Sequence, residues 1–146
     1  MGGNILNKKW QPTVLTPRQS DSIGHLKVVR RAIYIMRSDV HPDQYRFGAI
    51  GIRNGNTAVR RLGQCVKVVK GQVVHSWHYF VVAQLPDATP FKEVRRMEKI
   101  LKRTLIGPGG RFEFCRDSRR DLFVTDQSSS VLKAFRAAIQ TASGRV

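Results

Sequence analysis

Two apolar stretches, 28-VVRRAIYIM-36 and 45-YRFGAIGI-52, decide how this chain of 146 residues folds. Both are rich in β-branched and aromatic residues, and turn-forming residues lie between them at positions 38–43. Apolar runs between such turn signals are typical of paired β-strands. The run Asn-Gly-Asn at positions 54–56 closes the second stretch, so the sequence predicts a central β-hairpin with a long loop.

Further elements are predicted on the C-terminal side of this hairpin. They are a short helix at 57–64, a second hairpin of strands at 65–69 and 73–85 around Lys70-Gly71, a helix at 91–106, strands around 112–115 and 122–125, and a helix at 131–141 capped by the serines at 128–130. Residues 1–26 contain many turn-forming residues and predict a flexible basic arm. Residues 27–146 therefore predict one α+β domain, with a small, mostly antiparallel sheet flanked by helices.

The charge of the chain points to a polyanionic partner. Lys and Arg number 26 against 10 Asp and Glu, which gives a net charge of +16. Nucleic acid is the usual partner of such a protein. The hydrophobic content of 41% excludes a disordered basic tail. No apolar run is long enough to span a membrane and no secretory signal is evident, so we expect a cytoplasmic protein with no membrane partner.

One carboxylate departs from the pattern of the helix at 91–106. At 100° per residue its apolar stripe consists of Phe91, Val94, Leu101 and Leu105, and six cations lie on the opposite arc. Glu98 projects from the apolar stripe. Because an ionised carboxylate on a core face is costly unless a cation meets it, we expect an arginine or a divalent metal opposite Glu98. The alternative is a glutamate at the margin of the stripe that reaches water.

Four short segments occur in an order that resembles a known family. They are Ala32-Ile33-Tyr34, then Tyr45-Arg46-Phe47-Gly48, then Arg60-Arg61-Leu62, then Met97-Glu98-Lys99. This order resembles the GIY-YIG nuclease superfamily, in particular its phage-derived branch with a Tyr-Lys-Ile-Gly second motif. The segment Arg111-Phe112-Glu113-Phe114 is similar to the strand that follows the glutamate helix there. The resemblance covers roughly residues 29–126.

The resemblance implies metal-dependent hydrolysis of DNA phosphodiester bonds. Tyr34 matches the tyrosine that positions or deprotonates the attacking water, and Arg61 matches the arginine that clamps the scissile phosphate. Glu98 matches the glutamate that holds one Mg²⁺ or Mn²⁺ ion, and Arg46 is an auxiliary phosphate ligand. The residues expected to contact DNA are Tyr45, Arg60, Arg95, Lys99, Lys102 and Arg116.

Three positions depart from the family pattern. Ala32 replaces a glycine, Arg46 replaces a tyrosine or lysine, and Cys65 stands where many members carry a histidine. These departures keep open a catalytically silent nucleic-acid-binding or ribosome-associated protein. Charge alone also leaves open a membrane-surface or acidic-protein binder, and a homodimer stays open as an assembly.

Overall fold

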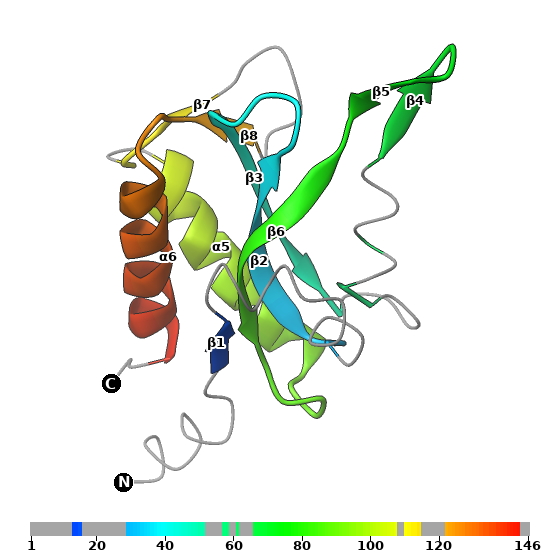
Figure 1. The fold of residues 1–146 in the computed structure, drawn as a ribbon. Helices are drawn as coiled ribbons and strands as arrows, with labels where there is room; N and C mark the ends of the chain where they lie inside the picture. Colours follow the sequence, from blue (N-terminus) through cyan, green and yellow to red (C-terminus); the bar gives the residue numbers. More distant parts are fainter. Residues whose placement is uncertain are drawn as a thin grey trace, which may run out of the picture.

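The computed structural model describes residues 13–15, 29–51, 57–58, 61, 66–107, 110–114 and 122–143. The described chain forms a six-stranded antiparallel sheet, with two helices packed against one of its faces (Figure 1). A separate two-stranded sheet extends away from it (Figure 1). The predicted α+β fold class, with a mostly antiparallel sheet and flanking helices, is confirmed.

The predicted central hairpin is present and occupies the middle of the sheet. It consists of β2 (Ala32–Ser38) and β3 (Gln44–Ile50), paired antiparallel. The sheet order is β1-β6-β2-β3-β8-β7, in which the outer strands are β1 (Thr13–Leu15), β6 (Trp77–Gln84), β8 (Leu122–Val124) and β7 (Glu113–Phe114). Strands from both ends of the chain thus surround the hairpin.

Both faces of the central strands are covered, which explains their continuous apolar character. Successive side chains of a strand point to opposite faces. In β2, Ile33 and Ile35 join the cluster that includes both helices, whereas Tyr34 and Met36 join a second cluster. We call the first side of the sheet the helix face and the second side the Tyr34 face.

Two helices of sixteen residues each cover the helix face. They are α5 (Phe91–Ile106), with the predicted bounds, and α6 (Ser128–Ser143), which starts three residues earlier than predicted. The serines at 128–130 therefore lie in the first turn of α6 and do not precede the helix, so their prediction as caps was wrong. Within the described chain, no helix has the length and apolar character required to span a membrane.

Two other predictions need correction. Thr13–Leu15 was assigned to a flexible arm, but it forms β1 and pairs with β6, with Leu15 buried; the rest of residues 1–26 lies outside the described residues. The strand predicted at 73–85 is two strands, because the strand conformation is interrupted at Ser76. Its first part is β5 (Gln72–His75), which pairs with β4 (Lys67–Val69), and its second part is β6.

Candidate functional site

Tyr34 occupies the centre of its face of the sheet. Its side chain is fully buried, and its ring meets that of Tyr79 edge-on, with centroids 5.2 Å apart. Tyr34 pairs directly with Gly48 on β3. A Cβ at Gly48 would lie 2.7 Å from Tyr34 Cζ, so only glycine leaves room for the phenol. This steric relation gives a physical reason for the glycine of the Tyr45-Arg46-Phe47-Gly48 segment.

Arg61 reaches Tyr34 from the segment that follows the hairpin. Its Nε–H donates to Tyr34 Oη at 3.1 Å. Ala58 and Arg61 are helical, as predicted for 57–64, and positions 59–60 and 62–64 of that prediction lie outside the described residues. The backbone at Ala58 is anchored twice, since its N–H donates to Val29 O at 3.1 Å and its carbonyl accepts from Tyr79 Oη at 2.8 Å. The structure therefore brings together two of the predicted catalytic residues.

Arg46 lies on the same face as Tyr34. It is two residues from Gly48 on β3, and therefore about 7 Å away along the strand. Its side chain is only 5% exposed, and its guanidinium carbon lies 5.4 Å from the centre of the Trp77 ring. This cation–π contact holds Arg46 against the sheet. Two guanidinium groups thus share the face that carries the Tyr34 hydroxyl.

Glu98 lies on the other side of the sheet. It belongs to α5, which packs on the helix face, whereas Tyr34 belongs to the cluster on the opposite face. The buried residues of α5 are Val94, Met97, Leu101 and Leu105. At 100° per residue they all lie to one side of Glu98, between about 20° and 100° from it. Glu98 is therefore half-buried at the margin of the apolar stripe.

Phe91 does not belong to this stripe. Its side chain is 45% exposed, and the Arg95 guanidinium packs over its ring. The buried stripe instead includes Met97, which lies about 120° around the helix from Phe91. The stripe is therefore centred away from Glu98, which explains why the periodicity placed this carboxylate too close to the core.

The described residues do not fit a divalent cation beside Tyr34. Such an ion needs oxygen ligands, and guanidinium groups supply none. Glu98, the carboxylate that the resemblance assigns to the metal, lies across the sheet from the Tyr34 hydroxyl. Among the described residues, no three metal-ligating side chains of the His, Cys, Asp or Glu type gather in one place.

The residues predicted to contact DNA fall into three groups. Arg95, Lys99 and Lys102 are exposed on α5, together with Lys92, Arg96 and Arg103, so the expected segregation of cations to the outer arc is confirmed. Arg60 and Arg116 lie outside the described residues. Tyr45 is fully buried on the helix face, stacked on Phe123 with ring centroids 5.5 Å apart, so its prediction as a DNA contact was wrong.

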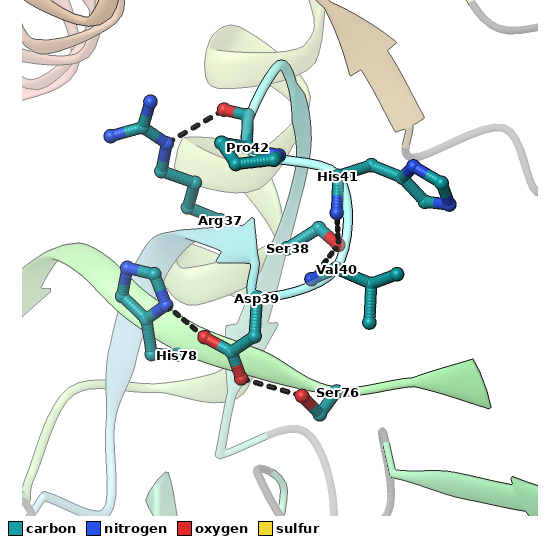
Figure 2. Close-up of polar contacts among 8 residues, drawn as sticks. All are labelled: Arg37, Ser38, Asp39, Val40, His41, Pro42, Ser76 and His78. Atoms are coloured by element: carbon teal, nitrogen blue, oxygen red, sulfur yellow. Dashed lines mark hydrogen bonds and ion pairs between the residues drawn. The ribbon is translucent and has the colours of Figure 1, made fainter. Parts of the chain in front are cut away.

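A second polar cluster, absent from the sequence prediction, joins the β2–β3 loop to the start of β6 (Figure 2). The Asp39 carboxylate accepts from Ser76 Oγ and from His78 Nδ1, both at 2.6 Å. The Asp39 backbone N–H also donates to Ser76 O at 3.0 Å. Partial burial alone would raise the pKa of Asp39, but the hydrogen bonds from Ser76 and His78 and the charge of His78 lower it overall. We call this arrangement the Asp39 clamp.

Comparison with known proteins adds no further assignment, because no protein-family model, curated protein or solved structure matches this chain.

Proposed function

We propose that this protein is a DNA endonuclease that hydrolyses a phosphodiester bond at Tyr34 and Arg61. The observation that carries the proposal is the 3.1 Å hydrogen bond from Arg61 Nε to Tyr34 Oη, formed over Gly48. The three residues come from three separate segments of the sequence. They are the tyrosine, arginine and glycine positions of the GIY-YIG resemblance.

The chemistry of these groups suits a phosphodiester substrate. Hydrolysis requires a water oxygen to attack phosphorus while the bond to the leaving oxygen breaks, and negative charge grows on the phosphate oxygens. A guanidinium can hold two of these oxygens and keeps its charge at every working pH. Arg61 and Arg46 would bind the phosphate, and Tyr34 would orient the water through a hydroxyl that Arg61 already fixes.

A second candidate is a nucleic-acid-binding protein without catalysis. Two observations favour it. Tyr34 has no exposed surface, and a buried phenol does not touch a substrate in this conformation. Glu98 is also separated from Tyr34 by the sheet. The net charge of +16 and the exposed cations of α5 are equally consistent with both candidate functions, since each requires binding of nucleic acid.

Nicking of supercoiled plasmid, with Mg²⁺ or Mn²⁺ and with EDTA, separates the two candidates. The nuclease proposal expects the wild-type protein to nick, and Tyr34→Phe and Arg61→Gln each to nick about 100-fold more slowly while binding DNA within about twofold of wild type. Tyr34→Phe keeps the ring that fills the space over Gly48, so the fold is preserved. Lys133→Gln, on the exposed side of α6, is the matched control for loss of one cation.

The metal requirement that the resemblance implies is measured in the same assay. Glu98→Gln keeps the size of the side chain and removes its charge. Because α5 packs on the face of the sheet opposite Tyr34, this variant is expected to nick DNA at about the wild-type rate. Loss of nicking with DNA binding retained would instead support the metal-holding role that the resemblance implies for Glu98. A wild-type protein that binds DNA but nicks with neither metal contradicts the nuclease proposal and selects the second candidate.

A further inference from the structure

The most exposed apolar surface of the described chain lies on one small element. The β4–β5 ribbon consists of residues 66–75, with its strands joined at Lys70-Gly71. Seven large apolar side chains are exposed in the described chain, and five of them are valines of this ribbon, between 38% and 56% exposed: Val66, Val68, Val69, Val73 and Val74. Val68 pairs with Val73 and Val69 pairs with Gln72, so exposed valines lie on both faces of the ribbon. Soluble proteins seldom leave so much apolar surface exposed on one element without a partner.

The ribbon extends away from the main sheet (Figure 1). Its two strands form a sheet of their own, with Val68 directly opposite Val73. Lys70 and Gly71 both have positive φ, 51° and 79°, which makes the turn between the strands tight. An isolated two-stranded hairpin is marginally stable in water, so a partner that covers the valines would stabilise it.

The base of the ribbon is fixed to the main sheet. Ser76 connects β5 to β6, and it is the residue whose hydroxyl and carbonyl bind Asp39. The neighbouring His78 binds the other oxygen of the same carboxylate, as Figure 2 shows. The Asp39 clamp therefore holds the point where the ribbon leaves the sheet. Because its base is held in this way, the β4–β5 ribbon loses less conformational freedom on binding a partner than a flexible loop would.

We propose that the β4–β5 ribbon is a DNA-binding arm that enters the major groove of duplex DNA. The proposal rests on the DNA partner of the proposed function and does not require cleavage. The major groove is about 12 Å wide and admits a two-stranded ribbon. The four residues of β5 extend over about 13 Å, which exceeds the groove depth of about 8.5 Å. The ribbon can therefore reach the base edges.

The composition of the ribbon favours DNA over a second copy of the chain. Residues 66–75 contain Lys67 and Lys70 and no acidic residue. Two ribbons would bring these lysines together, on chains that each carry a charge of +16, whereas phosphates would neutralise them. Valine methyl groups are suited to contacts with thymine methyl groups on the groove floor.

Two classes of ribbon variant test the proposal by fluorescence anisotropy with a labelled 20-base-pair duplex in EDTA. Lys67→Gln with Lys70→Asn removes two charges, and asparagine tolerates the left-handed backbone at position 70. We expect about tenfold weaker binding at 0.1 M salt and a salt dependence smaller by about two phosphate contacts. Lys133→Gln with Arg136→Gln on α6 is the charge-matched control.

The second class leaves the charge unchanged. Val68→Thr with Val73→Thr keeps the β-branched shape and is expected to weaken binding at least about fivefold, with an unchanged salt dependence. Val40→Thr, at an exposed valine outside the ribbon, is the control. Melting temperatures near the wild-type value establish that both classes are folded, since the altered side chains are exposed.

Three results would overturn the proposal. The first is binding by both ribbon variants with wild-type affinity and salt dependence. The second is a change from dimer to monomer in Val68→Thr with Val73→Thr, seen by sedimentation with DNA affinity unaltered, which would assign the ribbon to a second copy. The third is a wild-type protein that does not bind the duplex. A protein that binds through the ribbon but never nicks DNA contradicts only the nuclease proposal.

Discussion

Tyr34 and Gly48 face one another across β2 and β3, and the phenol of Tyr34 fills the space that a side chain at position 48 would need. This arrangement is set by the pairing register of the central hairpin, which aligns the two residues. Arg61 then meets the hydroxyl from a different segment. The position of Tyr34 therefore depends on the pairing register of the hairpin, on the hydrogen bond from Arg61 and on the absence of a Cβ at Gly48. The last of these is the simplest to change by mutation.

Gly48→Ala is expected to destabilise the protein by about 1–3 kcal/mol, the usual cost of an added methyl group in a packed core. The new Cβ would overlap the ring of Tyr34, and the ring cannot move freely because Tyr79 packs against it. Urea unfolding measures the change. In a Tyr34→Ala background the same substitution is expected to cost much less, because the overlapping ring is gone. An equal cost in both backgrounds would contradict the steric account.

The Asp39 clamp predicts a pH dependence of stability. The folded-state pKa of Asp39 is below its ordinary value of 3.8. Its contribution to stability is therefore present above that ordinary value and is lost as the pH falls through the lower, folded-state pKa. We expect Asp39→Asn to be less stable than wild type at pH 7, with a difference that shrinks below about pH 4. Urea midpoints at pH 7, 5 and 3 measure this, and a difference that stays constant over the series would exclude Asp39 as its source.

The hydroxyl of Tyr45 is predicted to be dispensable. It is buried and has no hydrogen-bond partner among the described residues. Tyr45→Phe removes this polar atom and keeps the ring that stacks on Phe123, so we expect stability at pH 7 to be unchanged or to rise by about 1 kcal/mol. A loss of more than that would show that the hydroxyl has a stabilising role.

The same variant has a distinct behaviour in alkali. Burial, together with Asp43, raises the pKa of Tyr45 above 10.0, although the charge of Arg37 opposes this shift. Unfolding therefore releases a proton from Tyr45 once the pH rises past its ordinary pKa of 10.0, so the stability of the wild-type fold falls as the pH rises from there through the raised, folded-state pKa. Tyr45→Phe is expected to lose less stability than wild type between pH 9 and 11.

The cations of α5 predict a salt-sensitive contribution to DNA binding. Lys99 and Lys102 are exposed on the outer arc of the helix and make no contribution to its buried stripe. Lys99→Gln with Lys102→Gln is expected to reduce the salt dependence of duplex binding by about two phosphate contacts, without a change in melting temperature. Unaltered salt dependence would place the DNA elsewhere on the molecule.

Local signals predicted the elements of the fold well. The bounds of α5 agree with the sequence because Pro90 and Gly107 delimit it and its apolar period is regular. The break at Ser76 escaped prediction because residues on both sides of it favour a strand. The bend depends on the contacts of Ser76 with Asp39, which is far away in sequence.

The grouping of the candidate site residues could be predicted only in part. Tyr34 and Arg61 were expected together and they meet. Which face of the sheet α5 covers is decided by tertiary packing, so the separation of Glu98 from Tyr34 carries no local signal. The burial of Tyr45, in contrast, could have been predicted from the sequence. Tyr45 and Gly48 are three residues apart on a strand, which places them on opposite faces, and Gly48 pairs with Tyr34.

The alternation of β2 between two faces has a consequence for how this protein can vary. Inserting one residue inside β2 would move every side chain beyond that point to the opposite face of the sheet. Tyr34 or its neighbours would then point towards the helices. The turn at Lys70 and Gly71 is different, since a Cβ at Gly71 meets no other atom within 4 Å. Natural length variation among descendants of this sequence should therefore accumulate at the end of the ribbon, while the central hairpin keeps a constant number of residues.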